Sequence, residues 1–142
     1  MPNFATVEMK EVKGSTQTFE KLYVNNVCFL DEFEKEIKNT SQYYSEYMTI
    51  ISYMNCVANG QKLPDTKFKI LKGGKKGVTR FEFKSKNLRI YGIGNPGGKL
   101  VIMGGFKNDQ KSDIRRFDNL IKDYDKHLQK ITKDEQRRIA NK

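Results

Sequence analysis

Hydrophobic side chains recur at two different periods along the chain, and the changes of period divide it into four regions. Residues 5–29 hold two strand-like runs, "FATVEMKEV" and "TFEKLYVNNVCF", on either side of the polar segment "KGSTQ". In residues 30–59 the apolar side chains recur at steps of three and four, which is typical of an amphipathic helix. We expect "KNTSQ" to divide this region into an antiparallel helix pair that Gly60 and Pro64 end. The apolar stripe consists of Leu30, Phe33, Ile37, Thr40, Tyr44, Tyr47, Ile51 and Met54.

Residues 68–106 carry three strand signals, and the first two, "VTRFEFK" and "LRIYGI", alternate between apolar and polar side chains. A two-residue loop of Lys86 and Asn87 would pair Lys84 with Arg89 and keep the polar side chains together. A three-residue loop would instead place Phe83 opposite Arg89. The apolar pattern therefore selects the two-residue loop. It predicts a solvent-facing cluster on one sheet face, made of Arg80, Glu82, Lys84, Arg89 and Tyr91.

The third strand signal, "KLVIMGGF", is apolar on both faces and predicts a more buried strand. It follows "GNPGG", so Gly92, Gly94 and Gly97 have the spacing of a dinucleotide-binding fingerprint. That fingerprint requires a helix after the glycines, because the helix N-terminus holds the pyrophosphate. We therefore interpret "GNPGG" as a hairpin turn and expect no nicotinamide or flavin cofactor.

The last region is predicted to be one helix over residues 112–140. Its apolar stripe can cover either the sheet or the helix pair, and consists of Ile114, Phe117, Ile121, Tyr124, Leu128 and Ile131. The other helix faces are basic, which usually marks a solvated surface. His127, the only histidine, lies far along this helix, where a lone histidine is more often structural. The four regions together predict a single α+β domain over residues 1–142.

The composition adds a strong charge signal. The chain has 27 Lys and Arg residues against 17 Asp and Glu residues, a formal net charge of +10. Such an excess favours polyanionic partners such as nucleic acid. No membrane-spanning run and no secretory signal pattern is visible, so we expect a cytoplasmic protein. Cys28 and Cys56 have no metal-ligand spacing and are expected to be buried, reduced packing residues.

The predicted polar cluster has the residue types that RNA cleavage needs. A base must take the 2′-hydroxyl proton, cations must stabilise the developing charge, and an acid must protonate the leaving oxygen. Glu82 supplies a carboxylate and Tyr91 supplies a hydroxyl and a ring. The alternative interpretation is that Glu82 only pairs with its basic neighbours on an exposed sheet face.

The stretch from "FKILKGGKKGVTRFEFK" through "LRIYGIGNPGGKLVIMGGFKNDQK" to "DNLIKDY" resembles the RelE/HigB-type toxins of bacterial type II toxin–antitoxin systems. The shared features are a basic strand at residues 80–84, Leu88-Arg89, the "GNPGG" hairpin, the apolar strand and "FKNDQK". With the helix pair, the resemblance covers roughly residues 29–124.

The resemblance implies a small twisted antiparallel sheet packed on an α-hairpin, with a long C-terminal helix added. It implies a metal-independent endoribonuclease that acts on translating mRNA and is inhibited by an antitoxin. Arg89 matches the phosphate-stabilising Arg, while Arg80, Glu82 and Lys84 lie on the strand that supplies basic and acid–base groups. Members often have a His or Tyr where this chain has "GGFKND", so the general acid is unassigned. The residues expected to hold RNA are Lys86, Lys107 and Lys111.

Two other functions remain open on the sequence. The chain can be a binding module of the same fold that does not cut RNA, either a degenerate relative or one similar to the gyrase-inhibiting ParE branch. It can also be a plain basic interaction protein, a reading that rests on charge alone. Growth arrest and shortened mRNA on induced expression separate the first hypothesis from the binding module.

Overall fold

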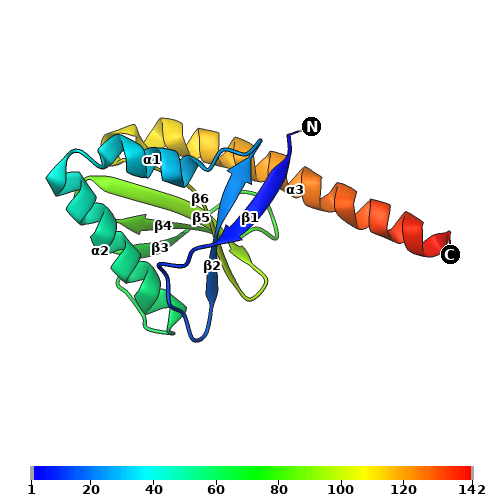
Figure 1. Ribbon diagram of the computed structural model, residues 1–142, viewed down its shortest axis with the longest axis horizontal. Coiled ribbons are helices and arrows are strands. Elements are labelled where there is room, and N and C mark those ends of the chain that lie inside the picture. The colour runs from blue at the N-terminus through cyan, green and yellow to red at the C-terminus, as the bar shows by residue number, and fades with distance from the viewer. Residues whose placement is uncertain (1, 142) are drawn as a thin grey trace.

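The computed structural model describes residues 2–141, which form a six-stranded sheet between helices (Figure 1). The α+β class predicted from the sequence is confirmed. The strands are β1 (Phe4–Glu8), β2 (Thr18–Val24), β3 (Phe68–Leu71), β4 (Arg80–Lys84), β5 (Leu88–Asn95) and β6 (Gly98–Phe106). The helices are α1 (Phe29–Ile37), α2 (Ser41–Ala58), the short 3-10 helix η1 (Lys107–Asp109) and α3 (Gln110–Ala140).

The sheet is mixed, so the expectation of an antiparallel sheet was wrong at one position. The strand order is β1-β2-β6-β5-β4-β3, and β2 pairs with β6 in parallel, while all other neighbours are antiparallel. Parallel neighbours require a long crossover connection, which α1, α2 and the β3–β5 strands provide here. The two chains approach closely where this pairing begins. A Cβ at Gly98 would lie 1.8 Å from the Thr18 carbonyl oxygen, so only glycine fits there.

The predicted register of the β4–β5 hairpin is confirmed. Lys84 lies opposite Arg89, and Glu82 lies opposite Tyr91. The "GNPGG" turn is also confirmed as a hairpin, since Asn95 pairs with Gly98 and Gly97 has a φ of 77°. Strand β3 was not among the three predicted strands, because a strand of four residues is too short to show a period.

Helices α1 and α2 cover one face of the sheet. The predicted break is confirmed, since α1 ends at Ile37 and α2 begins at Ser41. Figure 1 shows the two helices diverging in an open V rather than packing side by side as an antiparallel pair. The core on this face is apolar, with the sheet residues Phe19, Phe81, Phe83, Leu88, Ile90 and Val101 packed against helix residues such as Leu30, Phe33 and Ile50.

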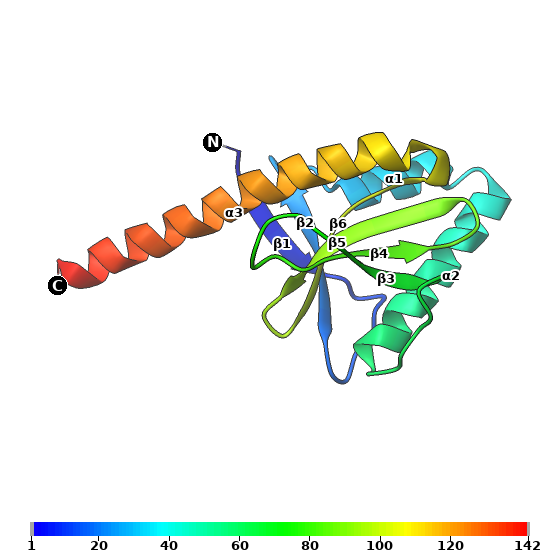
Figure 2. The same ribbon diagram turned by 180° about the vertical axis from the view of Figure 1, so that it is seen from behind.

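The first half of α3 covers the opposite face, where Phe117, Ile121 and Tyr124 are buried against the sheet. The second half projects away from the body of the protein (Figure 2). Leu128 and Ile131 are therefore 42% and 51% exposed, although they continue the same apolar stripe. The sequence predicted the helix and its apolar stripe, but it did not show at which residue α3 stops packing against the sheet.

The structure also bears on the two cysteines and on membrane insertion. Cys28 is buried, as expected, but Cys56 is only half-buried on α2. Among residues 2–141, no helix is both long enough and apolar enough to span a bilayer.

Candidate functional site

The predicted polar cluster does lie on one sheet face, but it is buried rather than solvent-facing. Arg80, Glu82, Arg89 and Tyr91 are 7%, 2%, 8% and 0% exposed. The physical reason is that α3 begins directly after β6 and η1 and runs back across this face. We call this side of the sheet, together with the part of α3 that covers it, the α3 face. Only Lys84, at the end of β4, keeps partial exposure.

Arg80 is held at the end of β4 that lies near the β3–β4 loop. Its guanidinium donates to the Asp118 carboxylate on α3 at 2.9 Å and to the Lys72 carbonyl oxygen at 2.7 Å. Its Nε is buried without a hydrogen-bond partner in the protein. Arg80 therefore fastens α3 to the sheet through its bond to Asp118.

Glu82 occupies the middle of the cluster. One carboxylate oxygen accepts a hydrogen bond from the Gln110 side chain at 2.7 Å, and the other lies 3.5 Å from the Lys84 ammonium. Lys69 on β3 is the cross-strand partner of Glu82, so its side chain leaves the strand on the same sheet face. The Glu82 carboxylate is thus held between a neutral amide donor and the Lys84 ammonium.

Arg89 lies opposite Lys84 and forms no ion pair with any carboxylate of the described chain. Its Nη1 donates to the carbonyl oxygens of Ser85 and Leu88, at 2.7 and 2.8 Å. Its Nε is buried and has no partner. The positive charge is thus oriented by neutral backbone groups but is not neutralised by them.

Tyr91 lies next to Arg89 along β5 with its side chain on the same face. Its ring stacks on Phe117 with the centroids 5.5 Å apart, and its buried hydroxyl has no hydrogen-bond partner in the protein. Burial raises the pKa of Tyr91, and the negative charges of Glu82 and Asp113 raise it further. The hydroxyl therefore stays protonated at neutral pH and remains free to donate.

A carboxylate from α2 fixes the loop that leads into Arg89. Glu46 accepts hydrogen bonds from the Ser85 hydroxyl and, at 2.7 Å each, from the backbone and side-chain nitrogens of Asn87. Burial tends to raise the pKa of Glu46, but these hydrogen bonds lower it overall. Glu46 thereby orients Ser85, whose carbonyl oxygen in turn holds the Arg89 guanidinium.

The three lysines expected to bind RNA gather at one end of the sheet and are exposed. Lys86 lies in the β4–β5 loop, and the backbone of Lys107 reaches that loop through a 2.8 Å hydrogen bond to the Asn87 carbonyl oxygen. Lys111 follows in the first turn of α3. The structure therefore places these lysines on the rim next to Lys84 and Arg89.

Several residues of this site were missed from the sequence. Lys69 was missed because β3 was missed. Glu46, Gln110, Asp113 and Asp118 were missed because their helices carry many charged residues, and helical period alone does not show which of them meet a strand. One signal was available, since residues 110, 113, 117 and 118 share the side of α3 that carries the predicted apolar stripe.

The structure also bears on the lone histidine and on metal binding. His127 packs against the Phe4 and Tyr124 rings, with centroids 5.1 and 6.3 Å away, far from the cluster. Within residues 2–141, no three His, Cys, Asp or Glu side chains are grouped closely enough to hold a metal ion. The absence of dinucleotide binding stays a prediction.

Comparison with known proteins identifies no relative: no protein-family model, curated protein or solved structure matches this chain. The site must therefore be interpreted from its own chemistry. It combines a fixed carboxylate, an uncompensated guanidinium and a protonated phenol on two paired strands. Such a set can bind an anion and move protons beside it.

Proposed function

We propose that this chain is a RelE/HigB-type toxin, a cytoplasmic endoribonuclease that cleaves mRNA at the ribosome and is inhibited by a cognate antitoxin protein. Two things support the proposal: the resemblance over residues 29–124, and the groups that the α3 face brings together. The proposed reaction uses side chains alone, with neither a metal nor a dinucleotide cofactor.

The observation that carries the proposal is the state of Arg89. A buried guanidinium without a counter-anion is costly, because burial removes water from a charge that nothing neutralises. A phosphate beside Arg89 would supply both the missing charge and an acceptor for the free Nε. This fits the phosphate-stabilising role that the resemblance assigns to the same residue.

In the proposed reaction, Glu82 takes the proton of the 2′-hydroxyl and the 2′-oxygen attacks the phosphorus. Arg89 donates to the phosphorane oxygens as their charge develops, and Lys84 adds a second cation. The bond to the 5′-oxygen then breaks, and Tyr91 donates its proton to that leaving oxygen. The products are a 2′,3′-cyclic phosphate and a 5′-hydroxyl end, and the proton on Glu82 returns to Tyr91 through water.

The burial of the site sets a condition on this mechanism. RNA reaches Arg89 and Tyr91 only if the start of α3 moves away from the sheet, breaking the Gln110–Glu82 hydrogen bond. Lys86, Lys107 and Lys111 lie on the exposed rim at that end, where they would hold the RNA backbone first.

The direct test is Arg89→Ala. Loss of one preorganised cation typically lowers the rate by about 100-fold or more, so this variant should cleave ribosome-bound mRNA at least about 100-fold more slowly in single-turnover reactions. It should also no longer arrest growth when its expression is induced. Arg137→Ala is the matched control, because Arg137 is exposed near the end of α3, in the half that projects from the body of the protein, and its loss should change neither readout.

The burial of the catalytic candidates favours one alternative, a module of the same fold that binds RNA or protein without cutting. A wild-type protein that neither arrests growth nor shortens mRNA would contradict the nuclease proposal and leave this alternative. Retained RNA binding by such a protein would then show that the rim lysines act without the buried groups.

A further inference from the structure

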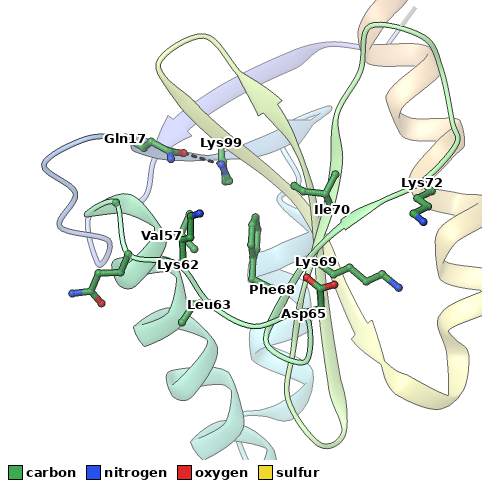
Figure 3. A pocket seen from close by; sticks show the side chains of 12 residues that line it. Gln17, Val57, Lys62, Leu63, Asp65, Phe68, Lys69, Ile70, Lys72 and Lys99 are labelled. Atoms are coloured by element: carbon green, nitrogen blue, oxygen red, sulfur yellow. Dashed lines mark hydrogen bonds between the residues drawn. The ribbon is translucent and has the colours of Figure 1, made fainter.

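A second cationic site lies on the other side of edge strand β3, away from the α3 face. It is a cavity of about 510 Å³ between the end of α2, the loop after it, β3 and the start of β6. Figure 3 shows Phe68 standing in its centre, with Lys99 and Gln17 on one side and Ile70 on the other. Cavities of this size commonly hold small ligands.

Lys99 is the unusual group of this cavity. Its ammonium donates to the Gln17 amide oxygen at 2.8 Å and lies 5.6 and 5.8 Å from the rings of Phe68 and Phe81. It forms no ion pair with any carboxylate of residues 2–141. Burial lowers the pKa of Lys99, which shows that its surroundings disfavour the charge. A neutral amide and two ring faces compensate a half-buried ammonium only in part.

The rest of the lining suits an anion that carries an apolar ring. Four lysines and a single acidic residue, Asp65, border the cavity, and Figure 3 shows two of the lysines, Lys69 and Lys72, pointing away from Phe68 toward α3. Val57, Leu63 and Ile70 form apolar walls around Phe68, and the side chain of Ile70 is half exposed. A simple anion would need the lysines but not these walls, and an uncharged ring would need the walls but not the lysines.

We propose that this cavity binds a nucleotide, with its phosphate on Lys99 and its base against Phe68 between Leu63 and Ile70. The exposed lysine at the rim, Lys62, then faces the remaining phosphate oxygens or the next phosphate of an RNA chain. The ligand is either a free nucleotide or one nucleotide of an RNA strand, since both present the same group. The inference does not depend on RNA cleavage at Arg89.

The test is calorimetric titration of the full chain with guanosine monophosphate, inorganic phosphate and a short single-stranded RNA. Lys99→Met should weaken the binding of guanosine monophosphate about 10- to 100-fold, as expected when a hydrogen bond to a charged group is lost. Lys76→Met is the matched control, because Lys76 is exposed in the β3–β4 loop outside the cavity lining and its loss should leave the affinity unchanged.

Phe68→Leu tests the contribution of the aromatic ring to the affinity separately from that of the Lys99 charge. It keeps an apolar side chain in place, so the fold should persist, while the affinity for guanosine monophosphate falls about 5-fold or more and that for inorganic phosphate stays constant. Thermal unfolding of both variants checks their folding. Lys99→Met should melt no lower than the wild type, because it removes a half-buried charge without a counter-anion.

The outcomes distinguish a free nucleotide from a nucleotide of an RNA strand, and binding in this cavity from binding on the α3 face. Binding of the RNA but not of guanosine monophosphate would identify the ligand as a nucleotide within a strand. Equal affinity for phosphate and guanosine monophosphate, or undiminished binding by Lys99→Met, would overturn the inference. Arg89→Ala should retain this binding; if it abolishes it instead, the nucleotide binds on the α3 face, and the cavity inference fails while the nuclease proposal stands.

Discussion

The two faces of the sheet differ in the kinds of side chain that are buried on them. The face under α1 and α2 is filled with apolar side chains such as Phe81, Phe83 and Ile90. The α3 face combines apolar contacts with buried arginines, a buried carboxylate and a buried phenol. Within the described chain, all buried side-chain polar atoms that lack a partner lie on the α3 face: Arg80 Nε, Arg89 Nε and the Tyr91 hydroxyl.

This difference shows where the protein gives up stability. Buried polar groups are almost always hydrogen-bonded, and each exception calls for a ligand, a water or a catalytic role. An apolar face under α3 would have been the simpler solution, because the α3 stripe is itself apolar. The α3 face is therefore the region in which packing alone does not explain the choice of side chains.

The largest expected effect concerns the chemistry of the α3 face. Glu82→Gln preserves the shape and can still bond Gln110, but it removes the group proposed to take the 2′-hydroxyl proton. Acid–base catalysis typically contributes about 100- to 10,000-fold, so single-turnover cleavage should slow within that range while RNA binding stays nearly intact.

Lys107→Ala is the contrasting variant for that experiment. It should weaken RNA binding and lower its salt dependence by about one ion, with a smaller effect on the cleavage rate of bound RNA. Equal changes of binding and rate in both variants would mean that the α3 face acts only as an electrostatic patch. Full activity of Glu82→Gln would move the base role to Lys84.

Next in size is the loss of packing on the apolar face. Phe83 is fully buried between the Phe19, Phe68 and Phe81 rings, with centroids 6.1, 4.7 and 5.6 Å away. Phe83→Ala should lower the free energy of unfolding by about 3–5 kcal/mol, as large-to-small changes in cores do. Urea unfolding followed by circular dichroism measures this. A loss below about 1 kcal/mol would show that this face is not the stabilising core.

A substitution on the α3 face should change the stability in the opposite direction. Tyr91→Phe removes a buried hydroxyl that has no partner and keeps the ring on Phe117, so it should raise the free energy of unfolding by about 1 kcal/mol. Tyr23→Phe is the control. The Tyr23 hydroxyl donates to Asp31 at 3.3 Å, so its removal should instead cost about 0.5–1 kcal/mol. A destabilised Tyr91→Phe would reveal a bound water on the hydroxyl.

The smallest effect concerns pH. Burial and the nearby charge of Asp109 raise the pKa of Asp113 above 3.8. The folded state then holds this proton more tightly than the unfolded state, so stability falls as the pH rises from 3.8 through the folded pKa and stays lower above it. Asp113→Asn should therefore gain less than about 1 kcal/mol at pH 7, since Asp113 is only partly buried and water screens its charge. The gain should vanish below pH 3.8; a constant difference would contradict the assignment.

The sequence predicted the strand register better than the burial of the site, for a physical reason. Alternation of apolar and polar residues shows which side chains share a sheet face, and it placed Arg80, Glu82 and Tyr91 together correctly. It does not show what covers that face. The stripe of α3 fitted either layer, and the polar side of β4 and β5 was interpreted as solvated because it is polar.

Pairing between strands far apart in the sequence was the other feature that the sequence did not predict. The parallel contact of β2 with β6 joins Thr18 to Gly98, and no local pattern specifies such a partner. Strand β3 was too short to detect, and Lys69 was missed with it. The cavity around Lys99 was equally hidden, because Gln17, Phe68 and Lys99 come from three distant segments.

The position of β6 also determines when the protein can fold during its synthesis. β6 is the last strand to leave the ribosome, yet it is the one that joins the β1–β2 hairpin to the β3–β5 strands. Until it emerges, the nascent chain holds two separate half-sheets whose apolar faces have only α1 and α2 for cover. Assembly of so many distant contacts is slow compared with helix formation. A ribosome stalled before residue 98 would therefore carry a chain with no α3 face, and with none of the chemistry proposed for it.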